Sequence, residues 1–548
     1  MRLIARSLST LLFAGVALAG DPAPLGPELV VNETLGYQQE WGKVAMSQDG
    51  TRLAVAWSSV LGNEVWIRFY DGDGTPRGPE QQVNTVLIDG VQDEPMVAMD
   101  DAGNVLVCWS DRNDYDGGAM GTGEKMGCFG RIFGPDDLPL GPEIQLNQKV
   151  AKSQWEPHPN ALPGGGWSVS FNGDSDGDAY LTFFDTDGTP RGPDAQVNTF
   201  DSNGQTEAEH ALTRDGQLLY VFADFSGHGA GGTGTNLWAR LYDETGAALQ
   251  TEEFLVNENT LDFDQLEPRM AAAGIDYGFG GFIIVWEDWG NDGSSAGIYA
   301  RLYDRDAQPL GPEFRVNGSA AGTQRLPEVA ADYLGNFCVT WQDDSQGDWR
   351  IMARHFDRSG KPEGNQFEVS EGYPGDYLRP QVALDASGEL FAFTYSGPGK
   401  SGPGNNGEDV YLRLFERPAI TPLGTPEIGG IHGWLLDLPG GEDQFYILAA
   451  AFSAGTGLAL PDGRVLPVDF DALFRFSLNN PDGAPSPFEG FQGVLGTSEL
   501  GLASVTLPSN PLLIGLPIHV AAATFDLEFA ALKFQLRHVT RSRSVIIE

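Results

Sequence analysis

"GPELVVN" occupies residues 26–32, and close copies of it return six times along the chain. The copies are "GPEQQVN" at 78, "GPEIQLN" at 141, "GPDAQVN" at 192, "EEFLVN" at 252, "GPEFRVN" at 311 and a weaker "GNQFEVS" at 364. The residues that end the seven copies lie 51–63 positions apart: Asn32, Asn84, Asn147, Asn198, Asn257, Asn317 and Ser370. Self-similarity at such a period indicates a repeat architecture.

Each period contains four strand-like runs, which we label A to D. In the sixth period they read "LPEVAAD", "NFCVTW", "RIMARHFD" and "FEVS". Apolar and small residues alternate with polar ones, and turns rich in Gly, Asp and Asn bound the runs. Four short antiparallel strands make a small sheet, and such a sheet repeated around an axis is a β-propeller.

The seventh period supplies runs A to C as "RPQVALD", "LFAFTY" and "VYLRLFE", but no D run follows Pro418. The missing run has its counterpart at residues 26–32, ahead of the first complete repeat. We therefore predict an all-β fold in which this N-terminal strand completes the last blade and closes a seven-bladed propeller over residues 25–417, which buries two sheet edges. An open stack that begins within a repeat is the alternative.

The repeat carries the pattern Q-x-x-P-x-V-A, F-x-V-x-W, A-R-L-Y-D and G-P-E-F-x-V-N, and it resembles β-propeller repeats of large secreted bacterial proteins. This resemblance implies a fold and not an activity. The chain lacks the S-x-D-x-G-x-T-W box of the sialidase propellers, so no glycosidase residues are assigned from that family.

The two ends of the chain differ from the repeats. Residues 1–20 contain two arginines, an apolar run and Ala17-Leu18-Ala19, which predicts a signal peptide and a secreted protein, whether periplasmic, extracellular or on the cell surface. Residues 418–548 contain short apolar runs broken by Gly, Pro and Asp, which predict a small β-sandwich domain. Its most apolar stretch is interrupted by charged residues and Pro517, so we expect no membrane insertion, and we expect a monomer.

The chain of 548 residues has 76 acidic and 33 basic residues, a net charge of −43. Such a surface disfavours binding to nucleic acid and to anionic membranes. Solubility or a saline habitat explains the charge, and cation binding is the alternative. Of the three cysteines, Cys108 and Cys128 fall on neighbouring strands and leave a disulfide open, whereas Cys338 is expected to be buried.

Length variation gathers in the B–C connections, which leave a propeller on one face and form a rim there. These loops are rich in acids and glycine, as in "SDRNDYDGGAMGTGEK" (110–125), "EDWGNDGSS" (287–295) and "QDDSQGD" (342–348). Loops on a rigid scaffold commonly carry function. The predicted ligand-binding rim consists of Asp111, Asp114, Asp116, Asp288, Asp292, Asp343, Asp344 and Asp348.

One B–C loop, "NGDSDGD" at 172–178, matches the first half of a calcium-binding loop. Its candidate ligands are Asn172, Asp174, Asp176 and Asp178, so Ca²⁺ is the one cofactor that we consider. Phe183 stands where a bidentate Glu would complete the motif. A solvated acidic turn therefore remains the other interpretation.

Three residue series recur once per repeat and are interpreted as structural. The aromatic residues on run B are expected to pack between blades. The arginines on run C are expected to pair with a carboxylate of the neighbouring blade or to stack on its aromatic ring. The glutamines ahead of run A (Gln39, Gln92, Gln154, Gln205, Gln265 and Gln324) are expected to satisfy backbone groups between blades.

The chain carries no H-E-x-x-H, G-x-S-x-G, P-loop or dinucleotide motif, and its many carboxylates single out no catalytic pair. We therefore predict a non-enzymatic binding or adhesion protein whose acidic B–C face takes an extracellular glycan or protein ligand. The alternative is an extracellular polysaccharide hydrolase or lyase with its active site on the same face. A buried carboxyl group of raised pKa at that face would favour the enzyme, and a flat, solvated rim would favour binding.

Overall fold

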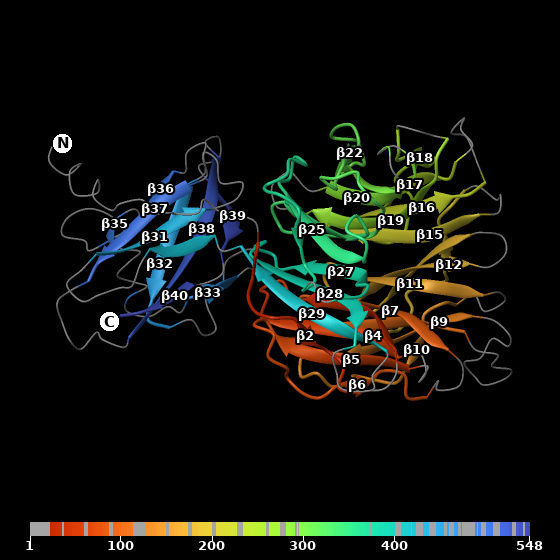
Figure 1. Cartoon of the computed structure of the whole chain (residues 1–548), viewed down its shortest axis with the longest axis horizontal. Coiled ribbons are helices and arrows are strands. Elements are labelled where there is room, and N and C mark those ends of the chain that lie inside the picture. The colour runs from red at the N-terminus through yellow and green to blue at the C-terminus, as the bar shows by residue number, and fades with distance from the viewer. Residues whose placement is uncertain are drawn as a thin grey trace.

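In the computed structural model, strands joined by turns make up most of the described residues (Figure 1). The residues that it describes are 22–34, 38–59, 64–86, 91–112, 126–148, 153–173, 178–199, 204–226, 234–258, 262–273, 281–290, 293, 295–371, 374–399, 407–417, 419–423, 431–437, 445–453, 458–459, 465–468, 473, 488–489, 491–494, 500–507, 516–528, 533–540 and 543–547. No helix in these ranges has the length and apolar character needed to span a bilayer. The predicted signal peptide lies outside them.

The described part of residues 23–416 forms seven antiparallel sheets, numbered here in chain order. Sheet 1 contains β3 (Gln39–Met46), β4 (Arg52–Ser59), β5 (Glu64–Asp71) and β6 (Gln81–Gln82). Sheet 2 contains β7 (Gln92–Met99), β8 (Val105–Asp111), β9 (Gly127–Phe133) and β10 (Ile144–Gln145). Sheet 3 contains β11 (Gln154–Ala161), β12 (Trp167–Gly173), β13 (Ala179–Phe184) and β14 (Ala195–Gln196).

The other four sheets repeat this order. Sheet 4 contains β15 (Gln205–Leu212), β16 (Gln217–Asp224), β17 (Asn236–Asp243) and β18 (Phe254–Leu255). Sheet 5 contains β19 (Gln265–Ala273), β20 (Gly281–Asp288), β21 (Gly297–Asp304) and β22 (Phe314–Arg315). Sheet 6 contains β23 (Gln324–Ala331), β24 (Phe337–Asp343), β25 (Arg350–Phe356) and β26 (Phe367–Glu368). Sheet 7 contains β27 (Leu378–Leu384), β28 (Leu390–Pro398), β29 (Glu408–Glu416), β1 (Ala23–Pro24) and β2 (Leu29–Val30).

The first strand of each sheet packs against the first strand of the next, and β27 of sheet 7 packs against β3 of sheet 1. The sheets therefore form a closed cycle whose inner wall consists of these first strands. The second strands lie between two neighbouring sheets, and every residue of β4, β8, β12, β20 and β24 is buried. The recurring run-B aromatics are fully buried, as predicted: Trp57, Trp109, Phe171, Phe222, Trp286, Trp341 and Tyr395.

The N-terminal segment joins sheet 7, which confirms the predicted pairing (Figure 1). Leu29 lies opposite Leu412 and Val30 opposite Tyr411, and the backbone N–H of Val31 donates to the carbonyl of Val410 at 2.9 Å. The strand that precedes the first complete repeat, β2, is therefore an outer strand of the last sheet.

The Asn that ends each "GPExxVN" copy explains why the motif recurs. Its side-chain oxygen accepts a hydrogen bond from the backbone N–H that opens the third strand of the same sheet. The donors in sheets 1 to 5 are Val65, Cys128, Ala179, Leu237 and Ile298, at 2.8–2.9 Å. Asn32 makes the same bond to Val410 in sheet 7, also at 2.9 Å.

The recurring arginines hold neighbouring sheets together through a backbone group that the sequence did not predict. Five of the six donate to the carbonyl of the residue ahead of the motif Asn or Ser in the preceding sheet, whereas Arg240 donates to the Gln250 carbonyl of its own sheet. The pairs are Arg68–Val31, Arg131–Val83, Arg301–Val256, Arg354–Val316 and Arg413–Val369. Some of these arginines also pair with a carboxylate of the preceding sheet, as Arg301 does with Glu258 at 2.5 Å. The aromatic ring beneath each guanidinium group belongs to the arginine's own sheet, as Tyr303 does for Arg301.

The recurring glutamines also differ from expectation, because they bind side chains, some in their own sheet and some in the preceding sheet. Gln39 accepts from the Trp57 indole at 2.9 Å, and Gln154 accepts from Asn147 at 2.8 Å. The three cysteines are free thiols in buried positions, and burial raises their pKa values.

Two further sheets and a small hairpin follow residue 417 (Figure 1). One sheet contains β30 (Ile420–Leu423), β31 (Ile431–Asp437), β37 (Leu500–Thr506) and β35 (Phe488–Glu489). The second contains β36 (Gln492–Val494), β32 (Phe445–Ala451), β38 (Pro517–Glu528), β39 (Lys533–Val539) and β40 (Arg543–Ile546). The hairpin pairs β33 (Leu458–Ala459) with β34 (Val465–Leu466). Trp434 of the first sheet and Leu448 of the second belong to one hydrophobic cluster.

The closure of the cycle predicts that Asn32→Ala destabilises the protein. The substitution leaves the Val410 N–H without its acceptor in a buried position, and we expect a loss of about 1–3 kcal/mol in the free energy of unfolding. Exposed Asn365, in the turn ahead of β26, provides the matched control, and Asn365→Ala should change stability by less than about 0.5 kcal/mol. Urea unfolding followed by tryptophan fluorescence measures both, and equal effects of the two substitutions would contradict the assignment.

Candidate functional site

Every inner strand carries a β-bulge near its start, at the end where the second strand finishes. The register with the second strand shifts at the same place in all seven sheets. The third residue of the strand, or its equivalent in sheet 7, has a positive φ of 50–57°. These residues are Trp41, Glu94, Glu156, Glu207, Glu267, Leu326 and Arg379.

A left-handed backbone costs a residue with a side chain about 1–2 kcal/mol, whereas glycine adopts it freely. The chain contains 72 glycines, yet none occupies a bulge position. Each bulge therefore retains a side chain at the expense of backbone strain, and bulges are frequent beside active sites, where they aim a side chain. The bulge side chains are accordingly candidates for function.

Four consecutive sheets place a glutamate at the bulge. We call Glu94, Glu156, Glu207 and Glu267, from sheets 2 to 5, the acidic arc; all four are half-buried. The Glu267 N–H donates to Glu207 Oε2 at 2.7 Å, and Asn172 donates to Glu156 Oε2 at 2.6 Å. Glu94 pairs through Oε1 with Arg112 at 3.3 Å, while its Oε2 is buried without a hydrogen-bond partner among the described residues.

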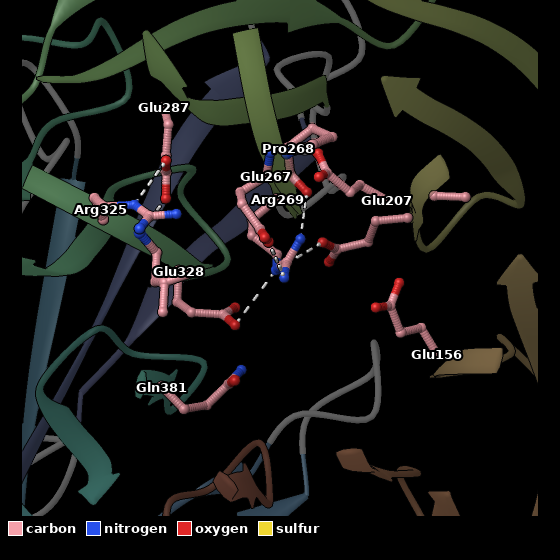
Figure 2. A network of polar contacts seen from close by, with 12 residues as sticks. Glu156, Glu207, Glu267, Pro268, Arg269, Glu287, Arg325, Glu328 and Gln381 are labelled. Carbon is pink, nitrogen blue, oxygen red and sulfur yellow. Dashed lines mark hydrogen bonds and ion pairs between the residues drawn. The ribbon is translucent and has the colours of Figure 1, made fainter. Parts of the chain in front are cut away.

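A second ring of residues lies two positions further along each inner strand: Lys43, Met96, His158, Glu209, Arg269, Glu328 and Gln381. Lys43 binds Glu328 at 2.9 Å and Gln381 at 2.8 Å, which links sheets 1, 6 and 7. Arg269 pairs with Glu267 at 2.9 Å and with Glu328 at 3.4 Å. Figure 2 shows Arg269 at the centre of this network, with Glu156, Glu328 and Gln381 directed toward the same space.

The crowding of carboxylates away from water changes their proton affinity. Burial raises the pKa of Glu156 to about 8, with the charges of Glu94, Glu267 and Glu207 adding to this effect and Arg269 opposing it. Burial also raises the pKa of Glu94 to about 7 and that of Glu207 to about 7, helped by Asp93 and Glu267 respectively. The acidic arc therefore holds a protonated carboxyl group at neutral pH.

The other end of the axis is crossed by contacts between the turns that follow the inner strands. Arg214 of sheet 4 pairs with Asp101 of sheet 2 at 3.0 Å and lies over the ring of Tyr333 of sheet 6. Gln48 of sheet 1 accepts from the Tyr333 hydroxyl, and its carbonyl accepts from the N–H of Ala386 of sheet 7 at 2.8 Å. The acidic arc lies at the opposite end of the inner strands, where the bulges are.

A separate crevice opens between the outer strands of sheets 4 and 5, and its lining includes Leu249, Glu258 and Arg301. It lies away from the inner strands, and its arginine is already engaged by the Val256 carbonyl at 2.7 Å. Since the same arginine contact recurs in other sheets, we assign this crevice to the packing of sheets and not to chemistry.

The predicted rim residues lie at the bulge end of the sheets, but those that the structure describes already bind neighbouring backbone N–H groups or side chains. Asp343 accepts from the Ser345 N–H at 2.8 Å, and Asp288 from the Gly290 N–H at 3.1 Å. Asp344 accepts from the Thr323 N–H at 2.6 Å. Asp348, which is exposed, accepts from the Gly375 N–H at 3.2 Å. Asp111 is buried and accepts from Gln92 at 3.3 Å, and Asp114, Asp116 and Asp292 lie outside the described residues.

Two of the four candidate calcium ligands, Asp174 and Asp176, also lie outside the described residues. The Asn172 oxygen accepts from the Ala208 N–H at 3.2 Å, and Asp178 accepts from Tyr180 at 3.0 Å and from Gln196 at 2.9 Å. Within the described ranges, no three His, Cys, Asp or Glu side chains are grouped so as to hold a metal ion. Calcium binding by this loop stays a prediction.

The acidic arc was not predicted from the sequence, although a signal for it exists. Its glutamates stand two residues after the recurring glutamines, in "QDE" at 92, "QWE" at 154, "QTE" at 205 and "QLE" at 265. A repeated Q-x-E at the start of the innermost strand places four carboxylates at one register position around one axis.

No protein-family model and no curated protein sequence matches the chain. Solved structures of similar fold include the polysaccharide lyase Uly1, with 11% identity and a TM-score of 0.45 over 72% of this chain and 99% of that chain. The α-L-arabinofuranosidase Arb93A of Fusarium graminearum has 12% identity and a TM-score of 0.41 over 71% and 98%. An α-L-arabinanase of Penicillium chrysogenum has 16% identity and a TM-score of 0.38 over 58% and 92%.

The prediction of a non-enzymatic binding protein is wrong. The bulge end is no flat, solvated rim, because half-buried carboxyl groups of raised pKa converge there. The sequence did not reveal this site, because its conspicuous acids lie in the predicted B–C loops, whereas the four glutamates lie on the inner strands.

The raised pKa predicts how Glu156→Gln changes stability with pH. Between the ordinary carboxyl pKa of 4.5 and about 8, the folded protein retains the Glu156 proton and the unfolded chain releases it. The contribution of Glu156 to stability therefore falls as the pH rises through this window, and the neutral amide removes that penalty. We expect the variant to melt about 1–3 °C above the wild type at pH 8 and to show a smaller difference at pH 5.

Differential scanning calorimetry at the two pH values measures this difference. Exposed Glu244, in the turn after β17, gives the matched control, since Glu244→Gln makes the same exchange of a carboxyl group for an amide at a position open to solvent. A Glu156→Gln variant that is less stable than the wild type by the same margin at both pH values would contradict the protonated state.

Proposed function

We propose that this chain is a glycoside hydrolase that cleaves a polysaccharide at the acidic arc. The observation that carries the proposal is the set of four half-buried glutamates at one register position of consecutive inner strands, one of which has a pKa of about 8. Glycosidic bonds are hydrolysed by a pair of carboxyl groups, one protonated and one ionised, at the same bond.

Glu156 is the proposed general acid, because it retains its proton at neutral pH and can donate it to the glycosidic oxygen as the C–O bond breaks. Glu267 is the proposed partner, since its carboxylate is paired with Arg269 at 2.9 Å. In this role Glu267 accepts a proton from the attacking water or attacks the anomeric carbon itself. Asn172 positions the Glu156 carboxyl group through its 2.6 Å hydrogen bond.

The charges around the arc favour hydrolysis over the alternative, elimination by a lyase. A lyase acts on uronic acids, whose carboxylates require unpaired cationic groups. Lys43 and Arg269 are already paired with Glu328 and Glu267. Carboxylates outnumber the cations here, so a neutral polysaccharide fits the site better than an anionic one.

The surrounding architecture belongs to the same proposal. We infer a seven-bladed propeller over residues 25–417, closed by the N-terminal strand, and a β-sandwich over residues 418–548. The protein is exported by its signal peptide and acts on an extracellular glycan.

The acidic loops of the predicted rim flank the arc. The loop at 172–178 is proposed to bind Ca²⁺, and calorimetric titration of the metal-free protein tests this binding.

Hydrolysis of neutral polysaccharides tests the proposal. Reducing ends should appear without the ultraviolet absorbance that marks the unsaturated product of a lyase. Glu156→Gln and Glu267→Gln should each lower kcat by about 10²–10⁴, the usual contribution of a general acid or base. Glu244→Gln, the same substitution at an exposed position, serves as the control.

Two outcomes would refute the assignment. One is full activity in both arc variants, and the other is an unsaturated product. Circular dichroism of each variant establishes that a loss of activity does not reflect unfolding.

A further inference from the structure

The three bulge positions outside the acidic arc carry no acid: Leu326, Arg379 and Trp41, in sheets 6, 7 and 1. The guanidinium carbon of Arg379 lies 4.7 Å from the centre of the Trp41 ring. Arg379 is itself held by Glu40 at 2.8 Å and by Glu408 at 3.4 Å. The cation and the ring therefore form one fixed unit beside the axis.

Trp41 is poorly explained as a core residue. It is half-buried, and it belongs to none of the hydrophobic clusters of the described residues, unlike Trp57 and Trp109. Its φ of 57° is also strained for a bulky side chain, at a position that glycine would occupy without cost. A large ring kept under strain and partly exposed indicates a binding role.

Glu94 is the neighbouring bulge residue, since β3 and β7 pack side by side. Its Oε2 has no hydrogen-bond partner among the described residues. An aromatic face next to an acceptor oxygen matches a pyranose or furanose ring, which has an apolar C–H face and hydroxyl groups at its edge.

We propose that Trp41, with Arg379 behind it, is a stacking platform for one sugar ring of a neutral polysaccharide, and that Glu94 Oε2 accepts a hydroxyl group of that ring. The platform lies at the sheet 1 end of the acidic arc. It rests on the proposed function, because it places a sugar next to the residues that cleave the chain.

A second tryptophan with an arginine over its ring lies at the other end of the arc. Trp289 follows β20 of sheet 5, is half-buried, and donates from its indole to Glu287 at 2.9 Å. Arg325 lies over its ring at 5.2 Å and pairs with Glu287 at 3.3 Å. An oligosaccharide that spans the arc would contact both tryptophans.

Binding to the full chain carrying Glu156→Gln and Glu267→Gln tests the platform, because this parent does not consume its ligand. An array of neutral and anionic polysaccharides identifies the ligand, and calorimetry measures its affinity. Adding Trp41→Ala should weaken binding at least tenfold, whereas Trp41→Phe, which keeps a ring, should retain affinity within about threefold. Half-buried Trp66, on the third strand of the same sheet, gives the control, and Trp66→Ala should leave affinity unchanged.

Trp41→Gly separates binding from folding. It should lose affinity like Trp41→Ala but melt no lower than that variant, because glycine relieves the positive φ. Unchanged affinity in Trp41→Ala, or binding to no neutral polysaccharide on the array, overturns the platform. If the wild type cleaves no glycan while Trp41-dependent binding persists, the platform stands and the hydrolase proposal fails.

Discussion

The attachment of residues 28–32 to the last sheet is the constraint on which the rest of the structure depends. The seven bulges reach one site only because their strands form a closed cycle, and this segment closes it about 380 residues away along the chain. Side chains reinforce the backbone pairing: the Glu28 carboxylate accepts from the Tyr395 hydroxyl at 2.6 Å and from the Glu371 N–H at 2.5 Å. Arg68 of sheet 1 then binds the Val31 carbonyl at 3.0 Å, so the same segment also ties sheet 7 to sheet 1.

This closure supports a site that is unfavourable for folding in itself. The acidic arc concentrates half-buried carboxyl groups, and each of its residues occupies a strained backbone conformation. The network around Lys43 and Arg269 offsets part of the repulsion and links inner strands of different sheets. A rigid ring that tolerates local strain is what a preorganised active site requires.

The sequence predicted the scaffold well, because the scaffold depends on residues that recur. The repeated Asn and the buried aromatics follow from the spacing, and so does the pairing of residues 29–31 with β29. The contacts of the arginines could not be predicted, since a guanidinium group binds a carbonyl as readily as a carboxylate and spacing does not distinguish the two.

The candidate site was harder to predict, for a physical reason. A β-bulge has no strong sequence signature when a non-glycine residue occupies it, so only the repeated Q-x-E spacing sets Glu94, Glu156, Glu207 and Glu267 apart from the other acids of a chain that has 76. The loop acids were more conspicuous, but Asp288 and Asp343 bind backbone N–H groups of their own loops, as short acidic side chains in turns often do. Local geometry, and not the density of charge, distinguishes the glutamates of the acidic arc from the aspartates of the loops.

The central claim is that the acidic arc holds a protonated Glu156 at neutral pH. Carbon-13 NMR of protein labelled at the glutamate side-chain carboxyl carbons tests this claim most directly, because the Glu156 signal can be assigned from its loss in Glu156→Gln. The account predicts that this signal titrates with a midpoint near pH 8. A midpoint at the ordinary carboxyl value of 4.5 would contradict it, since Glu156 would then be ionised at neutral pH and could not act as the general acid.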